Sequence, residues 1–259
     1  MILATLLLLA LAPAPLPRLQ EPTEKSQLAD ERPEVKALLD ELGGHVKARG
    51  EKDSEAIAVV DKLTQEFPNC GPKDRAAVVK TLSDCFDVKR PKELEPDVPD
   101  DRLYKAAATA LSVMGPESVK PLIAQIGSKE HRKNSSLQQM LALSLGKTKS
   151  VEGLKPLLML LKHKDAPMQA AGAQALANFL DAPLDTRKTV FEELLKTMMD
   201  QKARKDNVTD LEAQERWNVI SGPIIETLQK VTGHGETDPE LWQRWWNDNK
   251  KKEWGSKEG

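Results

Sequence analysis

The sequence predicts an all-α fold, a right-handed α-solenoid of about five to six helical hairpins. Three features lead to this prediction: apolar residues at helical spacing from residue 33 onward, punctuation by glycine and proline, and similar segments that recur about every 33 residues. The composition agrees, because 30% of the residues are charged and 4% are aromatic, which suits soluble helices better than sheets.

Helical spacing is clearest in residues 101–114, where Leu103, Ala107, Leu111 and Met114 fall on one face. No stretch sustains the alternation of a half-buried strand, so no strand is expected. The expected helices cover residues 33–49, 54–67, 73–87, 101–114, 117–127, 133–145, 151–163, 167–180, 186–200, 210–221, 223–232 and 239–250.

Glycine and proline separate these helices. Gly115 and Pro116 end one helix and start the next, because proline is tolerated in a first turn and not in a helix interior. Gly222 and Pro223 are expected to interrupt the chain in the same way. Taken in pairs, the expected helices form the hairpins of the solenoid.

Parts of the hairpins repeat. Residues 119–123 (VKPLI) match residues 154–158 (LKPLL), and the Ala-Leu pair of residues 110–111 returns at residues 142–143 and 175–176. A helix pair that recurs at this period is typical of a solenoid, in which neighbouring pairs stack because none can bury its apolar face alone.

Residues 150–183 resemble a complete HEAT repeat: a first helix, a short charged turn and an alanine-rich second helix. Residues 117–148 and 186–221 resemble it more loosely, and residues 231–246 are similar to a segment that closes some exported bacterial HEAT-like proteins. The sequence departs from the family where Met168 and Gln169 replace its usual arginine early in the second helix. The resemblance implies an armadillo-type helical repeat that serves in binding.

The N-terminus predicts export. Residues 2–12 form an apolar run too short to span a bilayer but suited to a signal peptide, and small residues follow it. We expect a signal peptide over residues 1–14, a flexible lead-in over 15–32, the solenoid over 33–250 with an insert at 88–100, and a disordered tail over 251–259. The expected location is periplasmic or extracellular; the alternative is a membrane tether by an uncleaved N-terminal segment.

The sequence contains none of the common catalytic or cofactor-binding motifs. It lacks the nucleophile, phosphate-loop and dinucleotide motifs, and the histidines His45, His131, His163 and His234 fall in different repeats without metal-ligand spacing. We therefore expect no catalytic, cofactor-binding or metal-binding residues. The histidines are interpreted as solvated turn residues.

Cys70 and Cys85 lie at the two ends of one expected helix. At about 1.5 Å per residue this helix separates them by roughly 20 Å, whereas a disulfide needs Cα atoms about 4–7 Å apart. No bond between them is expected.

Charge points to a candidate binding surface. Residues 101–170 carry six more basic than acidic side chains, although the whole chain has a net charge of −2, which gives no case for nucleic acid. In the expected hairpins, the turns from first to second helix align along one edge and contain clustered cations, with Lys89, Arg90 and Lys92 in the insert. The candidate partner-binding residues of this basic edge are Lys129, Arg132, Lys133, Lys162, Lys164, Lys202, Arg204 and Lys205.

Other interpretations remain open. The charged turns are also what solvent exposure alone would produce, and second-helix amides such as Gln138 and Gln169 offer an uncharged groove. Trp242, Trp245 and Trp246 share a helix face that either seals the end of the solenoid or forms an aromatic binding face.

The function predicted from the sequence is a non-catalytic exported scaffold that presents its basic edge to a protein or an acidic polymer. The alternative is an enzyme or enzyme accessory subunit on a HEAT-like scaffold, of the lyase or glycosylase kind.

Overall fold

The computed structural model describes residues 28–89, 93–95 and 98–254, and most of them are helical. The predicted signal peptide, most of the lead-in, Arg90, Lys92 and residues 255–259 lie outside the described residues. The α-helices are α1 (Pro33–Lys47), α2 (Asp53–Glu66), α3 (Pro72–Asp84), α4 (Arg102–Ser112), α5 (Val119–Gln125), α6 (Ser135–Lys147), α7 (Val151–Leu160), α8 (Ala166–Leu176), α9 (Leu184–Lys205), α10 (Leu211–Thr232) and α11 (Pro239–Asn249).

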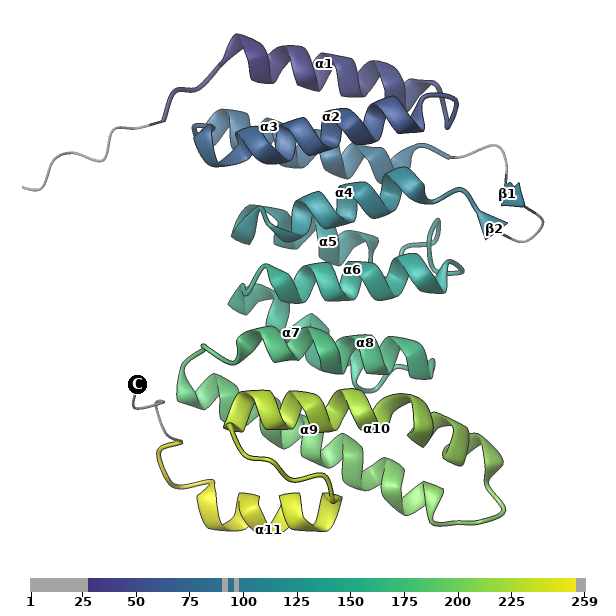
Figure 1. The fold of residues 1–259 in the computed structure, drawn as a ribbon, viewed down its shortest axis with the longest axis vertical. Coiled ribbons are helices and arrows are strands. Elements are labelled where there is room, and N and C mark those ends of the chain that lie inside the picture. The colour runs from purple at the N-terminus through teal and green to yellow at the C-terminus, as the bar shows by residue number, and fades with distance from the viewer. Residues whose placement is uncertain (1–27, 90–92, 96–97, 255–259) are drawn as a thin grey trace, which may run out of the picture.

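The helices pack in two layers. Helices α2, α4, α6, α8 and α10 follow one another in contact, and each also packs on the helix that precedes it in the chain. Figure 1 shows this series running along the long axis, with α1 at one end and α11 at the other. The last helix, α11, has no such partner after it and packs on α9.

The apolar stripes seen in the sequence form the core. Leu103, Leu111, Leu141, Leu176 and Ile220 are completely buried and belong to one cluster that extends through all the described helices. Within that part of the chain, no helix is long and apolar enough to cross a membrane.

A glycine permits a close contact between α6 and α8. A Cβ atom at Gly146 would lie 2.5 Å from the carbonyl oxygen of Ala175, a distance that a side chain does not tolerate. The missing side chain therefore lets the two helix backbones approach each other.

The predicted break at Gly222 and Pro223 is wrong, because α10 continues through both residues. Ile220, Ile224 and Leu228 lie on one face of α10 and are at most 1% exposed. Burial of this continuous face against α8 and α9 outweighs the one backbone hydrogen bond that the proline cannot donate.

Helix α9 is longer than predicted, which changes the place of three candidate residues. Lys202, Arg204 and Lys205 form its last turn and do not lie in a loop. Cations are favoured there because the C-terminal end of a helix carries partial negative charge.

The insert between α3 and α4 contains the two short strands β1 (Glu93–Glu95) and β2 (Val98–Pro99), which pair antiparallel. The expectation of no strand is therefore wrong for the insert, because strands this short do not sustain an alternation of apolar and polar residues. They project from the edge where α3 connects to α4 (Figure 1).

The aromatic residues of the C-terminal end pack together. Trp242 is completely buried, and its ring meets that of Phe191 of α9 at a centroid distance of 5.6 Å. Trp254 falls in the predicted tail, yet it is only 5% exposed and lies 5.5 Å from the same Phe191 ring. The ordered packing therefore extends past residue 250, and the cluster covers the end of the helical stack.

Candidate functional site

The cationic residues predicted to form a basic edge lie near the connections α5–α6, α7–α8 and α9–α10, which Figure 1 shows along one side of the molecule. The first connection, residues 126–134, holds exposed Lys129, Arg132 and Lys133. The second, residues 161–165, holds exposed Lys162 and Lys164. The third group is the last turn of α9, Lys202, Arg204 and Lys205.

A large cavity lies on this side. It is an open cleft of about 940 Å³ between the α7–α8 turn, the C-terminal half of α9 and the first turns of α10. We call it the basic cleft. Its cationic lining residues are Lys162, Lys164, Lys196, Arg204 and Arg216.

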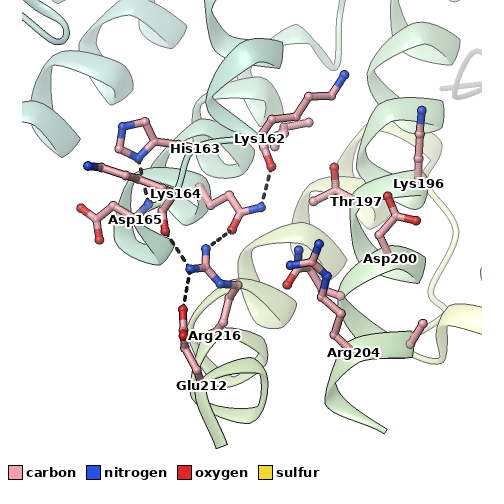
Figure 2. Close-up of a pocket in the computed structure, with 14 residues that line it drawn as sticks. Lys162, His163, Lys164, Asp165, Lys196, Thr197, Asp200, Arg204, Glu212 and Arg216 are labelled. Carbon is pink, nitrogen blue, oxygen red and sulfur yellow. Dashed lines mark hydrogen bonds and ion pairs between the residues drawn. The ribbon is translucent and has the colours of Figure 1, made fainter. Parts of the chain in front are cut away.

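Arg216 is held in place by three groups (Figure 2). Its Nη1 donates to Oε1 of Gln169 at 3.2 Å and its Nη2 to the carbonyl oxygen of Lys164 at 2.7 Å. Glu212, one turn earlier on α10, adds an ion pair at 3.5 Å. These contacts tie α10 to the α7–α8 turn and fix the guanidinium at the wall of the cleft.

Three cations of the basic cleft form no ion pair among the described residues. Lys164, Lys196 and Arg204 are exposed, and none of the ion pairs among the described residues involves them. In Figure 2 the Arg204 side chain extends from α9 toward the space that Arg216 faces from α10. These groups are free to bind an anion without first breaking an ion pair.

Lys202 and Lys205, in contrast, are occupied within the protein. Lys202 pairs with Asp206 at 2.9 Å and with Glu240 at 3.5 Å, contacts that raise the pKa of Lys202. The same lysine lowers the pKa of the Asp206 carboxyl. Lys205 lies 4.0 Å from Asp206, and its ammonium is 5.6 Å from the ring centroid of Trp217. Neither lysine lines the basic cleft.

A smaller cavity of about 130 Å³ adjoins the basic cleft, since His163 and Asp165 line both. Arg132 belongs to its lining, together with Gln138. Of the eight candidate residues, the structure thus brings Lys162, Lys164 and Arg204 into one cleft and places Arg132 in the next cavity. Lys129 and Lys133 line neither cavity.

Lys196 and Arg216 were missed because they lie on helix faces and not in turns. A signal was present in the sequence: Lys196, Asp200 and Arg204 are spaced by four residues, so one helix that continues to residue 205 aligns them on one face. The early end predicted for this helix concealed the alignment.

Two amides of the uncharged groove, Gln138 and Gln169, are already hydrogen-bonded within the protein. Gln138 donates to the carbonyl oxygen of Gln125 at 3.0 Å and accepts from the backbone N–H of Gly127 at 2.6 Å. Gln169 donates in the same way to the carbonyl oxygen of Leu161. Both side chains are 4% exposed, and each braces the turn that precedes its helix. Gln169 also contributes to the wall of the basic cleft, and Gln138 to that of the smaller cavity.

The interpretation of His131 as a solvated residue is wrong. It is 6% exposed and packs between the rings of Phe86 and Tyr104, with Nε2 2.8 Å from the carbonyl oxygen of Phe86. A carbonyl oxygen only accepts, so this ring nitrogen bears the hydrogen. His131 is a core residue that links two successive helix connections.

No disulfide joins Cys70 and Cys85, as expected, and both side chains are buried at the two ends of α3. Burial raises the pKa of the Cys70 thiol. In the described part of the chain, no group of three or more His, Cys, Asp or Glu side chains is placed to hold a metal ion.

The fold and the site together define a class: an all-helical protein of stacked helix pairs with an open, cationic cleft along the helix connections. Comparison with models of protein families, with curated proteins and with solved structures gave no match.

Proposed function

We propose that this protein is a non-catalytic, exported binding protein that holds an acidic part of a partner in its basic cleft. The observation on which the proposal rests is the presence of Lys164, Lys196 and Arg204 in one cleft without ion pairs among the described residues. Each exposed contact contributes about 0–1 kcal/mol, so binding depends on several acting together.

Within this proposal the scaffold is a right-handed α-solenoid of the HEAT-like kind. The successive contacts of α2, α4, α6, α8 and α10 support it. Further support comes from Gln138 and Gln169, which occupy equivalent places in two successive hairpins and make equivalent hydrogen bonds to the preceding turn. A stack of this kind presents one connection per hairpin at the same edge, which is how it gathers charges that are distant in the sequence.

Export is proposed on the sequence of residues 2–12, which lie outside the described residues. The mature protein would act in the periplasm or outside the cell. Its partner there would be a protein with an exposed acidic segment.

The test compares three forms of the tagged chain in its native host, with chemical cross-linking before capture. The parent and a control carrying Lys120→Glu, Lys155→Glu and Lys230→Glu should capture the same partner. A variant carrying Lys164→Glu, Lys196→Glu and Arg204→Glu should not capture it. The two triple variants change the net charge equally, and all the substituted side chains are exposed.

When the cross-linker is omitted, the captured pair should separate as salt is raised, because exposed charges are screened beyond about 10 Å at 0.1 M salt. Equal capture by the parent and by the cleft variant would refute the assignment of this cleft.

A further inference from the structure

The basic cleft is not uniformly positive. Asp165, Asp200 and Glu212 also line it, and of these Glu212 is paired with Arg216. Asp165 and Asp200 take part in none of the ion pairs among the described residues. In Figure 2 the Asp200 carboxylate lies beside Lys196 on α9, so the two signs of charge alternate along this wall.

This alternation distinguishes between two kinds of anionic ligand. A polymer with a negative charge on every unit would place anions next to Asp165 and Asp200 whenever it contacted the neighbouring cations. The repulsion between these like charges would weaken its binding. A chain whose charges alternate in sign meets complementary groups along the whole wall. The charge pattern therefore favours a peptide with both acidic and basic side chains over a polyphosphate or a sulfated polysaccharide.

A second observation concerns Gln201, which also lines the cleft. Its Oε1 atom is buried and has no hydrogen-bond donor among the residues that the structure describes. An unpaired buried acceptor destabilises a protein. Rotation of the Gln201 amide brings this oxygen into the cleft, where a ligand that supplies a donor gains affinity. A peptide backbone offers an N–H donor and a carbonyl acceptor in every residue, so it satisfies this amide whichever way its oxygen and nitrogen are turned.

The dimensions agree with a peptide segment. The volume of about 940 Å³ exceeds what a single anion fills, and the smaller cavity beside Arg132 continues the cleft past His163 and Asp165. An extended chain can therefore cross from α9 to the α5–α6 connection along the turns.

From these observations we infer that the ligand of the basic cleft is a peptide segment with alternating charges, held by its carboxylates on Lys164, Lys196 and Arg204 and by a backbone N–H on Gln201. The inference rests on the proposed function and specifies the chemistry of its partner. It excludes a uniformly anionic polymer as the ligand.

The test uses a displayed library of random 12-residue peptides. Peptides that bind the variant carrying Lys164→Glu, Lys196→Glu and Arg204→Glu are removed first, and the remaining peptides are selected on the full-length parent. Enriched peptides should contain at least two acidic residues and at least one basic residue. Polyphosphate and heparin, titrated with the same proteins, should bind more weakly than the enriched peptides.

Gln201→Leu tests the backbone contact separately from the charges, because it leaves the net charge of the protein unchanged. It should weaken the enriched peptides about 5-fold, the effect of one typical hydrogen bond. The matched control is Gln174→Leu, at an exposed position on α8 outside the cleft, which should bind as the parent does. Gln201→Leu removes an unpaired acceptor, so it should fold normally.

Two results would overturn the inference and are distinct from failure of the proposed function. Tighter binding of polyphosphate or heparin at the cleft would retain the anion-binding role and refute the peptide. If no peptide is enriched on the parent relative to the triple cleft variant, the peptide inference is also refuted. The role of the cleft itself is refuted only by the other experiment, if the parent and the cleft variant capture the partner equally. Equal affinity of Gln201→Leu and the parent would refute the assigned backbone contact.

Discussion

Arg216 of α10 donates a hydrogen bond to Gln169 of α8, with 3.2 Å between Nη1 and Oε1. The same Gln169 side chain donates to the carbonyl oxygen of Leu161, so one amide joins the α7–α8 turn to the next hairpin. The HEAT repeats that residues 150–183 resemble usually carry an arginine near the position of Gln169. Here the guanidinium reaches the turn from the following hairpin.

The first prediction concerns this contact. Arg216→Ala should lower the free energy of unfolding by about 1–3 kcal/mol, because it leaves two acceptors without their charged donor. Arg204→Ala, an exposed arginine of the same cleft, should change it by at most about 0.5 kcal/mol. Urea denaturation followed by circular dichroism measures both, and equal effects would contradict the structural role of Arg216.

The second prediction concerns the aromatic cluster. Trp242→Ala should destabilise the protein by about 3–5 kcal/mol, because the indole is completely buried against Phe191. Leu241→Ala, next to it and 41% exposed, should change the stability little. A small effect of Trp242→Ala in the same denaturation experiment would contradict the role of the cluster in sealing the end of the stack and would favour an aromatic binding face.

The third prediction uses two glycines that differ in their surroundings. Gly146→Ala should cost about 1–3 kcal/mol of stability, because its new Cβ would lie 2.5 Å from the Ala175 carbonyl oxygen of α8. Gly44→Ala, in α1 with no atom within 4 Å of the new Cβ, should instead stabilise by about 0.5–1 kcal/mol. Thermal melts compare the two, and the same sign for both would mean that α6 and α8 are farther apart than described.

The fourth prediction concerns the cysteines. Burial raises the pKa of Cys70, so less of the reactive thiolate is present at a given pH and alkylation should be slow until the protein unfolds. Mass spectrometry should find both thiols alkylated in denaturant without prior reduction. A linked Cys70–Cys85 peptide would show that α3 does not separate them.

The fifth prediction concerns export. Protein isolated from its native host should lack the first 12 or 14 residues, because small residues follow the apolar run of residues 2–12. N-terminal sequencing decides this. Intact Met1 in the cytosol would refute export, and intact Met1 in membranes would support the tether.

The helical class followed from local information alone. Apolar spacing identifies the buried face of each helix before any partner is known, and Leu103, Leu111 and Leu176 are buried as that spacing requires. Glycine and proline located most of the connections, because their effects on the backbone are local.

Tertiary packing decided the rest. Pro223 lies inside α10 because the face around Ile220 and Ile224 is buried continuously, and His131 is a core residue because Phe86 and Tyr104 enclose it. The sequence proposed a row of cations in turns, but only the structure places Lys196 and Arg216 with Lys164 and Arg204 in one cleft. Residues so far apart in the chain meet only through the stacking of hairpins, which no local pattern records.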